Sequence, residues 1–383
     1  MAAETSWIWS EWFWLPSNVS WSDLKNTDKA VYPRFNDLSV IFPLAVALLL
    51  IRTAFERCIA TPLGLLAGIK SKNHYDATPS TILEKVYKTV SKCPDRKRLE
   101  GLAKQLDWSV RTIERWFRRR RNQDRPSMLV KFTETSWRSV FYIASFSYGM
   151  YIVPTQPWFW DLRLCWQHFP FHPVTTEIYN YYMIEMSFYL SLILSLFTDV
   201  RRKDFVQQLI HHFTTIFLMG FSWTCNFTRV GCIVLVTHDV ADIFLETGKM
   251  FKYAQFEAGA NSMFGVFTAA FFLSRMLFFP LWIIYSAVFH SLEIIGPFPA
   301  YYLFNGLLII LQILNSFWFF LIACMVYKAL AHGQVTKDAR SDVEESGSES
   351  EEMEETNGKM NHNHNYTNHI NSNSNYKAVA NHH

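Results

Sequence analysis

The sequence predicts an all-α membrane protein that crosses the bilayer about seven times, with a small helical domain and a disordered C-terminal tail outside the membrane. Half of its 383 residues are hydrophobic and 17% are aromatic, which is too apolar for an ordinary soluble chain of this length. Several windows hold roughly 20 mostly apolar residues, enough to cross a hydrocarbon core. The net charge of +3 says little, because the charges are segregated between these windows.

The chain is expected to begin with a luminal segment, residues 1–37, followed by a first transmembrane helix, residues 38–57. Charges before this helix are almost balanced, whereas arginines and lysines follow it. The positive-inside rule therefore places the N-terminus in the lumen. Asn18 begins an Asn-Val-Ser sequon, which we expect to be glycosylated on that side of the membrane.

Residues 71–131 predict a basic, soluble, helical domain on the cytosolic side. Within it, V-R-T-I-E-R-W-F-R-R-R-R-N-Q resembles the second and third helices of a homeodomain, with Trp116 and Phe117 as the core pair. Arg119 occupies the position of the asparagine with which homeodomains read adenine, and the sequence shows no convincing first helix. We therefore do not expect DNA to be the main partner. The arginines are expected to meet anionic lipid headgroups or an acidic ligand such as coenzyme A.

Residues 132–330 are predicted to hold the remaining membrane spans and the catalytic domain. The expected spans are residues 137–153, 177–197, 205–223, 230–246, 263–289 and 301–327. Basic residues at alternate ends of these spans place the C-terminus in the cytosol.

Residues 331–383 form an acidic and then Asn/His-rich tail, which has almost no aliphatic residues and is expected to be disordered. Ser341, Ser346 and Ser348 each precede a glutamate by three positions, a pattern that predicts phosphorylation by acidophilic kinases.

Ionisable side chains interrupt the apolar segments between residues 197 and 250. Such groups are costly in a bilayer and usually face a cavity or the bundle interior, so they predict a functional site. Residues three and four apart share a helix face, which places His238, Asp242 and Glu246 on one stripe with Asp239 beside it.

His211 and His212 are neighbours on the preceding apolar segment. Consecutive residues of an α-helix are about 100° apart, so these side chains cannot point the same way. We expect one of them to take part in the reaction and the other to position that histidine or to pack against neighbouring side chains.

The series D-V-R-R-K-D-F, H-H, H-D-V-A-D and E-x-x-K-M resembles the Lag motif of ceramide synthases. The similarity extends from W-L-P-x-N-V-S-W through R-L-E-G-L-A-K-Q-L-D-W to K-D-A-R-S-D-V-E and covers most of the chain. The resemblance implies an endoplasmic-reticulum enzyme that joins a fatty acyl group from acyl-CoA to the amine of a sphingoid base. It also implies homodimers or heterodimers, and its closeness to the long-chain members suggests acyl chains of sixteen to eighteen carbons.

The sequence leaves two mechanisms open. A histidine could act as the general base for the amine, with an aspartate orienting the ring. Alternatively, a histidine could attack the thioester and carry the acyl group, and His211 is then favoured as the nucleophile. The predicted catalytic residues are His211, His212, His238, Asp239 and Asp242.

Substrate contacts are expected from two kinds of residue. A basic run at the mouth of the site could hold the phosphates of acyl-CoA, and two charged residues lie inside the membrane spans. These predicted contacts are Arg201, Arg202, Lys203, Glu185 and Arg275. Acyl-CoA is the expected co-substrate, with no further cofactor. No metal is expected, because the H-x-x-H-H clusters of di-metal lipid enzymes do not occur. The alternatives are a membrane-tethered transcriptional regulator and a non-catalytic lipid sensor or carrier.

Overall fold

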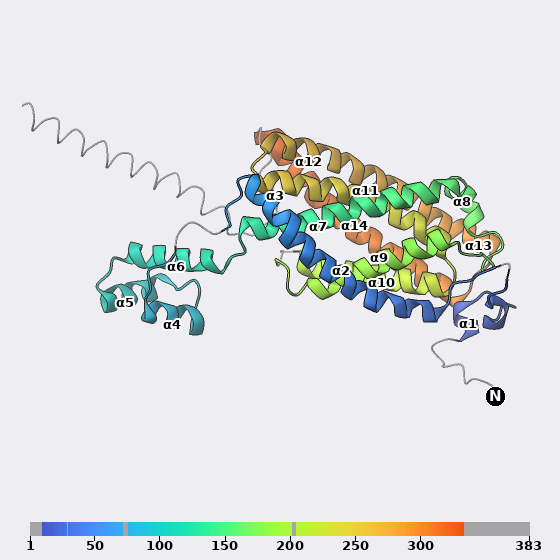
Figure 1. Cartoon of the computed structure of the whole chain (residues 1–383), viewed down its shortest axis with the longest axis horizontal. Coiled ribbons are helices and arrows are strands. Elements are labelled where there is room, and N and C mark those ends of the chain that lie inside the picture. Colours follow the sequence, from blue (N-terminus) through green and yellow to red (C-terminus); the bar gives the residue numbers. More distant parts are fainter. Residues whose placement is uncertain (1–9, 29, 72–75, 201–203, 333–383) are drawn as a thin grey trace, which may run out of the picture. The chain divides into compact units, whose positions relative to one another are not determined.

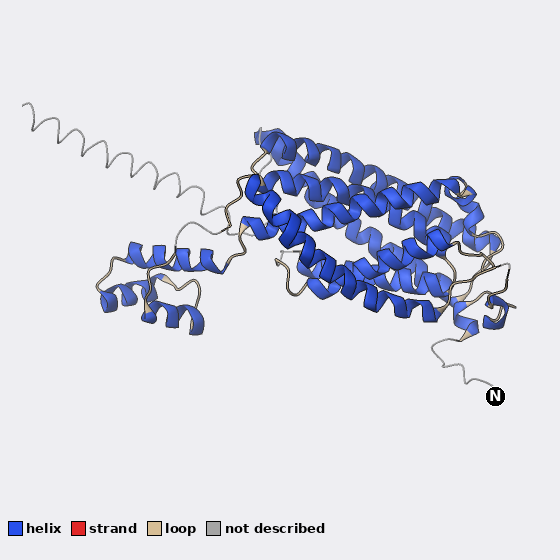
Figure 2. Cartoon of the chain, viewed as in Figure 1, coloured by secondary structure: helices blue, strands red, loops and turns tan. Residues whose placement is uncertain are grey.

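The computed structural model describes residues 10–332 apart from residues 29, 72–75 and 201–203. The described residues form helices and loops without a strand, so the predicted all-α class is confirmed (Figure 2). The chain forms two compact units, one of residues 1–201 with 206–322 and a smaller one of residues 202–205 with 323–383. Within the smaller unit the described part comprises a short stretch before residue 206 and the end of the last helix. The tail serines at positions 341, 346 and 348 lie outside the described residues.

Long helical segments pack side by side into a bundle in the larger unit (Figure 1). They are α2 (Ile41–Phe55) with η4 (Glu56–Ala60) and α3 (Thr61–Leu66), α7 (Met128–Ile152), α9 (Thr176–Ser195), α10 (Phe205–Thr224), α11 (Thr228–Tyr253), α12 (Glu257–Phe271) with η7 (Phe272–Ile284), η8 (Ser286–His290) and α13 (Ser291–Ile294), and α14 (Pro299–His332). α11 packs against α7, α12 and η7, and α2 packs against α9. α11 is therefore surrounded by other helices and contributes many of the buried polar residues.

Three of these segments are long and apolar enough, by length and composition, to cross a membrane: Phe35–Leu66, Glu257–Ile294 and Pro299–Ala331. The protein is thus a multi-pass membrane protein. α7, α9, α10 and α11 are also helices at the predicted positions, but each buries polar side chains that reduce its hydropathy. The total of about seven crossings stays a prediction.

Residues in two short connections close the end of the bundle that lies near the N-terminal segment. Asn226 is buried, and its side-chain amide donates to the carbonyls of Pro170 at 2.6 Å and His172 at 2.7 Å. Asn226 begins an Asn-Phe-Thr sequon, and this use of its amide leaves that sequon inaccessible. Asn18 is exposed, so the predicted glycosylation site lies on the surface.

The basic domain contains three helices, α4 (Thr81–Thr89), α5 (Arg96–Leu106) and α6 (Val110–Asp124). The expectation that a first helix is missing was therefore wrong. α4 is only nine residues long, but Leu83 and Tyr87 are one turn apart and both are buried against Trp116 and Phe117 of α6. Tertiary packing thus stabilises a helix that is marginal by itself.

An ion pair links α4 to α6 in this domain. Arg120 donates from Nε to Glu84 Oε2 at 2.8 Å and from Nη2 to Glu84 Oε1 at 3.0 Å. This two-pronged contact lowers the pKa of Glu84 to about 2 from its ordinary value of 4.5. Lys88, on the same helix as Glu84, contributes a weaker contact at 3.1 Å.

Arg120→Gln should weaken the acid sensitivity of this domain. A carboxylate whose pKa is lower in the folded state contributes stability above pH 4.5, and that contribution is lost as the pH falls toward 2. The thermal midpoint of a fragment of residues 76–127 should therefore fall between pH 5 and 3, and it should fall less in Arg120→Gln (circular dichroism). Arg111→Gln, at an exposed position of α6, should retain the full pH dependence. Identical pH profiles for Arg120→Gln and the unaltered fragment would contradict the account.

Candidate functional site

Polar side chains from six helical segments gather inside the bundle. They come from α7, α9, α10, α11, η7 and α14, and most of them are buried. The members that define this polar cluster are Ser145, Glu185, Tyr189, His211, His212, His238, Asp239, Asp242, Arg275, Asn315 and Trp318. The cluster therefore includes all the predicted catalytic residues.

His211 and His212 both lie against Tyr189 of α9. The ring centroids of His211 and His212 are 5.5 Å apart, and each lies 6.0–6.4 Å from the Tyr189 ring. The His211 ring also meets Trp318 edge-on at 5.3 Å. The Nδ1 atoms of both histidines are buried and have no hydrogen-bond partner among the described residues. Neither ring is thus held by a carboxylate at this atom, which departs from the expected aspartate–histidine pairing.

His238 occupies a different position, with both ring nitrogens in use. Its Nδ1 lies 2.8 Å from the carbonyl oxygen of Val234, and its Nε2 lies 3.3 Å from the amide nitrogen of Asn315. A ring that donates from Nδ1 and accepts at Nε2 is the neutral tautomer. These contacts give His238 a linking role between α11 and α14.

Arg275 has the partner that a charged residue at this depth requires. Its Nη2 donates to Asp242 Oδ2 at 2.5 Å and to the carbonyl of His238 at 2.7 Å. Arg275 and Asp242 therefore form a partly buried ion pair that joins η7 to α11. The Nε of Arg275 is buried and has no hydrogen-bond partner among the described residues, and the substrate contact stays a prediction.

Asp239 and Glu185 form a second buried group, which faces α7. Neither residue is exposed to solvent, and Asp239 Oδ2 accepts a hydrogen bond from Ser145 at 3.0 Å. The carboxyl groups of Glu185 and Asp239 are close enough to interact directly. Among the described residues, no group of three or more His, Cys, Asp or Glu side chains is arranged to hold a metal ion.

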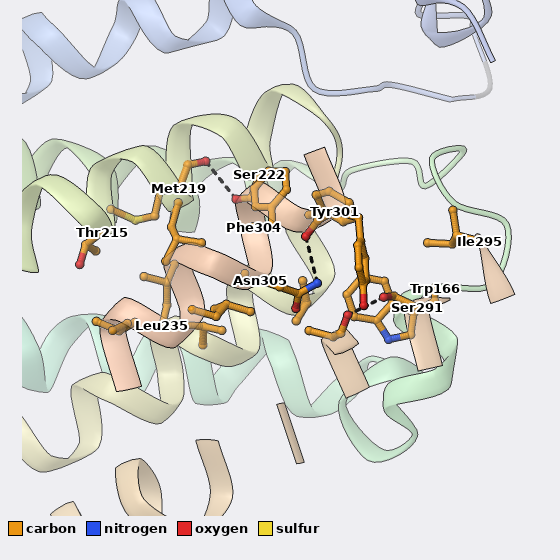
Figure 3. Close-up of a pocket in the computed structure, with 18 of the residues that line it drawn as sticks. Trp166, Thr215, Met219, Ser222, Leu235, Ser291, Ile295, Tyr301, Phe304 and Asn305 are labelled. Atoms are coloured by element: carbon orange, nitrogen blue, oxygen red, sulfur yellow. Dashed lines mark hydrogen bonds between the residues drawn. The ribbon is translucent and has the colours of Figure 1, made fainter. Parts of the chain in front are cut away.

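A cavity of about 70 Å³ lies inside the bundle (Figure 3), and its lining residue Thr215 is one helical turn from His211. Thr215, at one end of the cavity, donates to the His211 carbonyl at 2.8 Å, and Trp166 and Ile295 lie at the other end. Its walls are mostly apolar and come mainly from α10, α11 and α14. They include Leu218, Met219, Val230, Val234, Leu235, Phe298, Phe304, Leu308 and Leu311. The lining is suited to a hydrocarbon chain.

Comparison with known proteins identifies the family of the chain. The family model for the TLC domain matches residues 131–324, and the homeodomain model matches residues 70–126. The chain is 48% identical to human (Homo sapiens) ceramide synthase 5 over 90% of its own length and 88% of the relative. It is 42% identical to mouse (Mus musculus) ceramide synthase 4 over 91% and 88%. The Caenorhabditis elegans ceramide synthase hyl-1 is 35% identical over 88% and 84%.

The chain belongs to the ceramide synthase family. The resemblance carried by the Lag motif is thus confirmed, as are the TLC domain and the homeobox-like insert. The homeodomain match is a match of sequence, and Arg119 still stands where homeodomains place the adenine-reading asparagine.

A chain of ion pairs supports the ceramide synthase bundle, and sequence reasoning missed most of it. Arg52 of α2 contacts Asp199, which follows α9, at 2.7 Å, and Arg138 of α7 lies 3.7 Å from the same carboxylate. Arg138 also lies 3.2 Å from Glu246, which Lys249 contacts at 2.6 Å. An arginine inside the apolar run of α7 was the available signal, because it requires a buried partner. Asp199 precedes the basic run of residues 201–203, which lies outside the described residues.

Removing Arg138 should destabilise the protein strongly. Arg138→Ala leaves the buried Glu246 with Lys249 but without the arginine, and losing a hydrogen bond to a charged group costs about 1.5–3 kcal/mol. The thermal unfolding midpoint of the detergent-purified protein should fall by several degrees. Arg96→Ala breaks an exposed pair with Glu100 and should cost only about 0–1 kcal/mol. Equal effects of the two substitutions would contradict the structural role of Arg138.

Proposed function

We propose that this protein forms ceramide by transferring a fatty acyl group from acyl-CoA to the amine of a sphingoid base. Membership in the ceramide synthase family supports the reaction class. The observation that carries the proposal is the position of His211, whose ring lies one turn from an apolar cavity and whose Nδ1 has no partner among the described residues.

The helix register favours His211 over His212 as the acyl carrier. His211, Thr215, Leu218 and Ser222 share one face of α10, and the last three line the cavity. An acyl group on His211 could therefore lie along this face. His212 is one residue away, so its side chain leaves the helix about 100° around the axis from His211 and farther from this face.

The proposed first step is attack of a His211 ring nitrogen on the thioester carbonyl of acyl-CoA. A C–N bond forms, the C–S bond breaks, and the proton of the ring leaves with coenzyme A as its thiol. The cavity then holds the hydrocarbon chain away from water. A chain of sixteen to eighteen carbons is longer than the present cavity accommodates, so side chains would move aside as it enters.

The same proposal includes the cellular setting. The enzyme would lie in the endoplasmic-reticulum membrane with a luminal N-terminus carrying a glycan on Asn18 and a cytosolic C-terminus. Acyl-CoA would approach from the cytosol, and Arg201, Arg202 and Lys203 would bind its phosphates. Phosphorylation of the tail serines would regulate the enzyme, and the enzyme would form homodimers or heterodimers with related synthases.

A non-catalytic lipid carrier of the same fold is the second candidate. The cavity suits it equally well, but it gives no role to the adjacent histidines beside the cavity. The three-helix basic domain gives the DNA-binding alternative a complete fold, whereas Arg119 counts against base reading.

The test is the intact mass of the purified protein after incubation with palmitoyl-CoA and no sphingoid base. We expect a gain of one palmitoyl group, mapped to His211 by peptide fragmentation and discharged when sphinganine is added. His211→Ala should show no gain, and His290→Ala, a histidine outside the cluster bonded to Ser286, should behave like the unaltered protein.

Ceramide formation without any adduct would instead assign the histidines to general-base catalysis. A purified, folded protein that forms neither the adduct nor ceramide would refute the proposed activity and favour the carrier.

A further inference from the structure

We propose that Glu185 and Asp239 form the site that binds the ammonium group of the acceptor amine. The proposal rests on the proposed function and deepens it, because it assigns the second substrate to residues separate from the acyl-carrying histidine. Glu185 comes from α9 and Asp239 from α11, so the site lies between two central helices of the bundle.

The first argument is the set of oxygen atoms without donors. Both carboxylate oxygens of Glu185 and Oδ1 of Asp239 are buried and have no hydrogen-bond partner among the described residues. Both residues are 0% exposed. Asp239 Oδ2 is satisfied by Ser145 at 3.0 Å. The Tyr181 hydroxyl, one turn from Glu185 on α9, is likewise buried with no hydrogen-bond partner in the described part of the chain, and it lies near both carboxyl groups.

The second argument is electrostatic. Two adjacent carboxyl groups in an apolar interior cannot both carry a full charge, so they share one proton or take up a cation. The pair with one shared proton keeps one negative charge. Arg275, the cation on η7, donates to Asp242 through Nη2 and acts on Asp239 through its charge without a hydrogen bond. A shared proton lies between the two carboxyl groups and leaves their negative charge without a hydrogen-bond donor from the described residues, which is consistent with a ligand site.

An alkylammonium group matches the charge and the hydrogen-bonding capacity of this carboxyl pair. It carries one positive charge and three N–H donors, and the pair offers one negative charge and carboxyl oxygens that can accept hydrogen bonds. A neutral alcohol has a single donor and no charge, so it would leave the negative charge uncompensated. The site should therefore prefer a primary amine to the corresponding alcohol.

The position of the pair also suits the reaction. Tyr189 lies one turn beyond Glu185 on α9 and packs against both His211 and His212. An ammonium group held by Glu185 and Asp239 is thus placed on the same side of α9 as the histidine that carries the acyl group.

The second chemical step then balances without another reactant. The ammonium group transfers one proton to the carboxyl pair and becomes a neutral amine. The amine nitrogen attacks the carbonyl of the acyl-imidazole, the new C–N bond forms, and the bond from the carbonyl carbon to the ring nitrogen breaks. A second amine proton returns to the ring, the third stays on the amide, and the carboxyl pair later releases its proton to water.

The test separates the two half-reactions in Glu185→Gln and Asp239→Asn. Acylation by palmitoyl-CoA alone, followed by intact mass, should proceed as in the unaltered protein. The KM for sphinganine should rise or its kcat should fall, lowering kcat/KM for sphinganine by about tenfold to hundredfold, while kcat/KM for palmitoyl-CoA stays the same. Glu177→Gln, an exposed glutamate on the same helix, is the matched control and should change neither parameter.

An unchanged kcat/KM for sphinganine in both variants would overturn the proposal.

A second measurement uses the unaltered protein and so does not depend on variant folding. The acylated enzyme is offered sphinganine in competition with its analogue that carries a hydroxyl in place of the amine. If the acylated enzyme bound the analogue as tightly as it binds sphinganine, that result would also overturn the ammonium site. Failure of the unaltered protein to acquire an acyl group would refute the proposed function instead, and the two failures are distinguishable.

Discussion

The structure depends on one constraint: a charge inside an apolar bundle must have a partner. Arg275 meets this requirement with Asp242, and Arg138 meets it with Glu246. Each of these ion pairs joins two neighbouring helices and so stabilises the bundle. Buried polar atoms without a hydrogen-bond partner among the described residues occur beside these pairs, on His211, His212, Glu185 and Asp239, and single atoms of Arg275 and Asn315 share this property.

The helix register connects this site to the cavity. His211 and Thr215 share a face of α10. On α11 the lining residue Leu235 precedes His238 by three residues, and on α14 the lining residue Leu311 precedes Asn315 by four. The His238–Asn315 contact therefore joins α11 to α14 at the level where the cavity begins. This arrangement explains why a polar centre and an apolar cavity occur in the same bundle. The open polar atoms lie beyond one end of the hydrocarbon-lined space.

Hydropathy and helical spacing predicted the helices and the polar stripes, because both depend on local sequence. They also placed His211 beside His212 and drew attention to Glu185 and Arg275. The pairings could not be predicted, since Arg275 meets Asp242 only through the packing of η7 on α11, and Arg52 meets Asp199 across 147 positions. The short helix α4 was missed for the same reason: Leu83 and Tyr87 are stabilised by partners far along the chain. The Lag-motif resemblance predicted the family, but it did not distinguish the linking role of His238 from the open ring of His211.

An experimental structure of the acylated enzyme would test the central claim most directly. Cryo-electron microscopy of the protein after reaction with palmitoyl-CoA should show continuous density from a ring nitrogen of His211 past Thr215 into the space between α10, α11 and α14, ending toward Trp166. Glu185 and Asp239 should remain free of the acyl chain and lie within reach of its carbonyl end. Density for the chain on another residue, or in a space that does not include this cavity, would contradict the account.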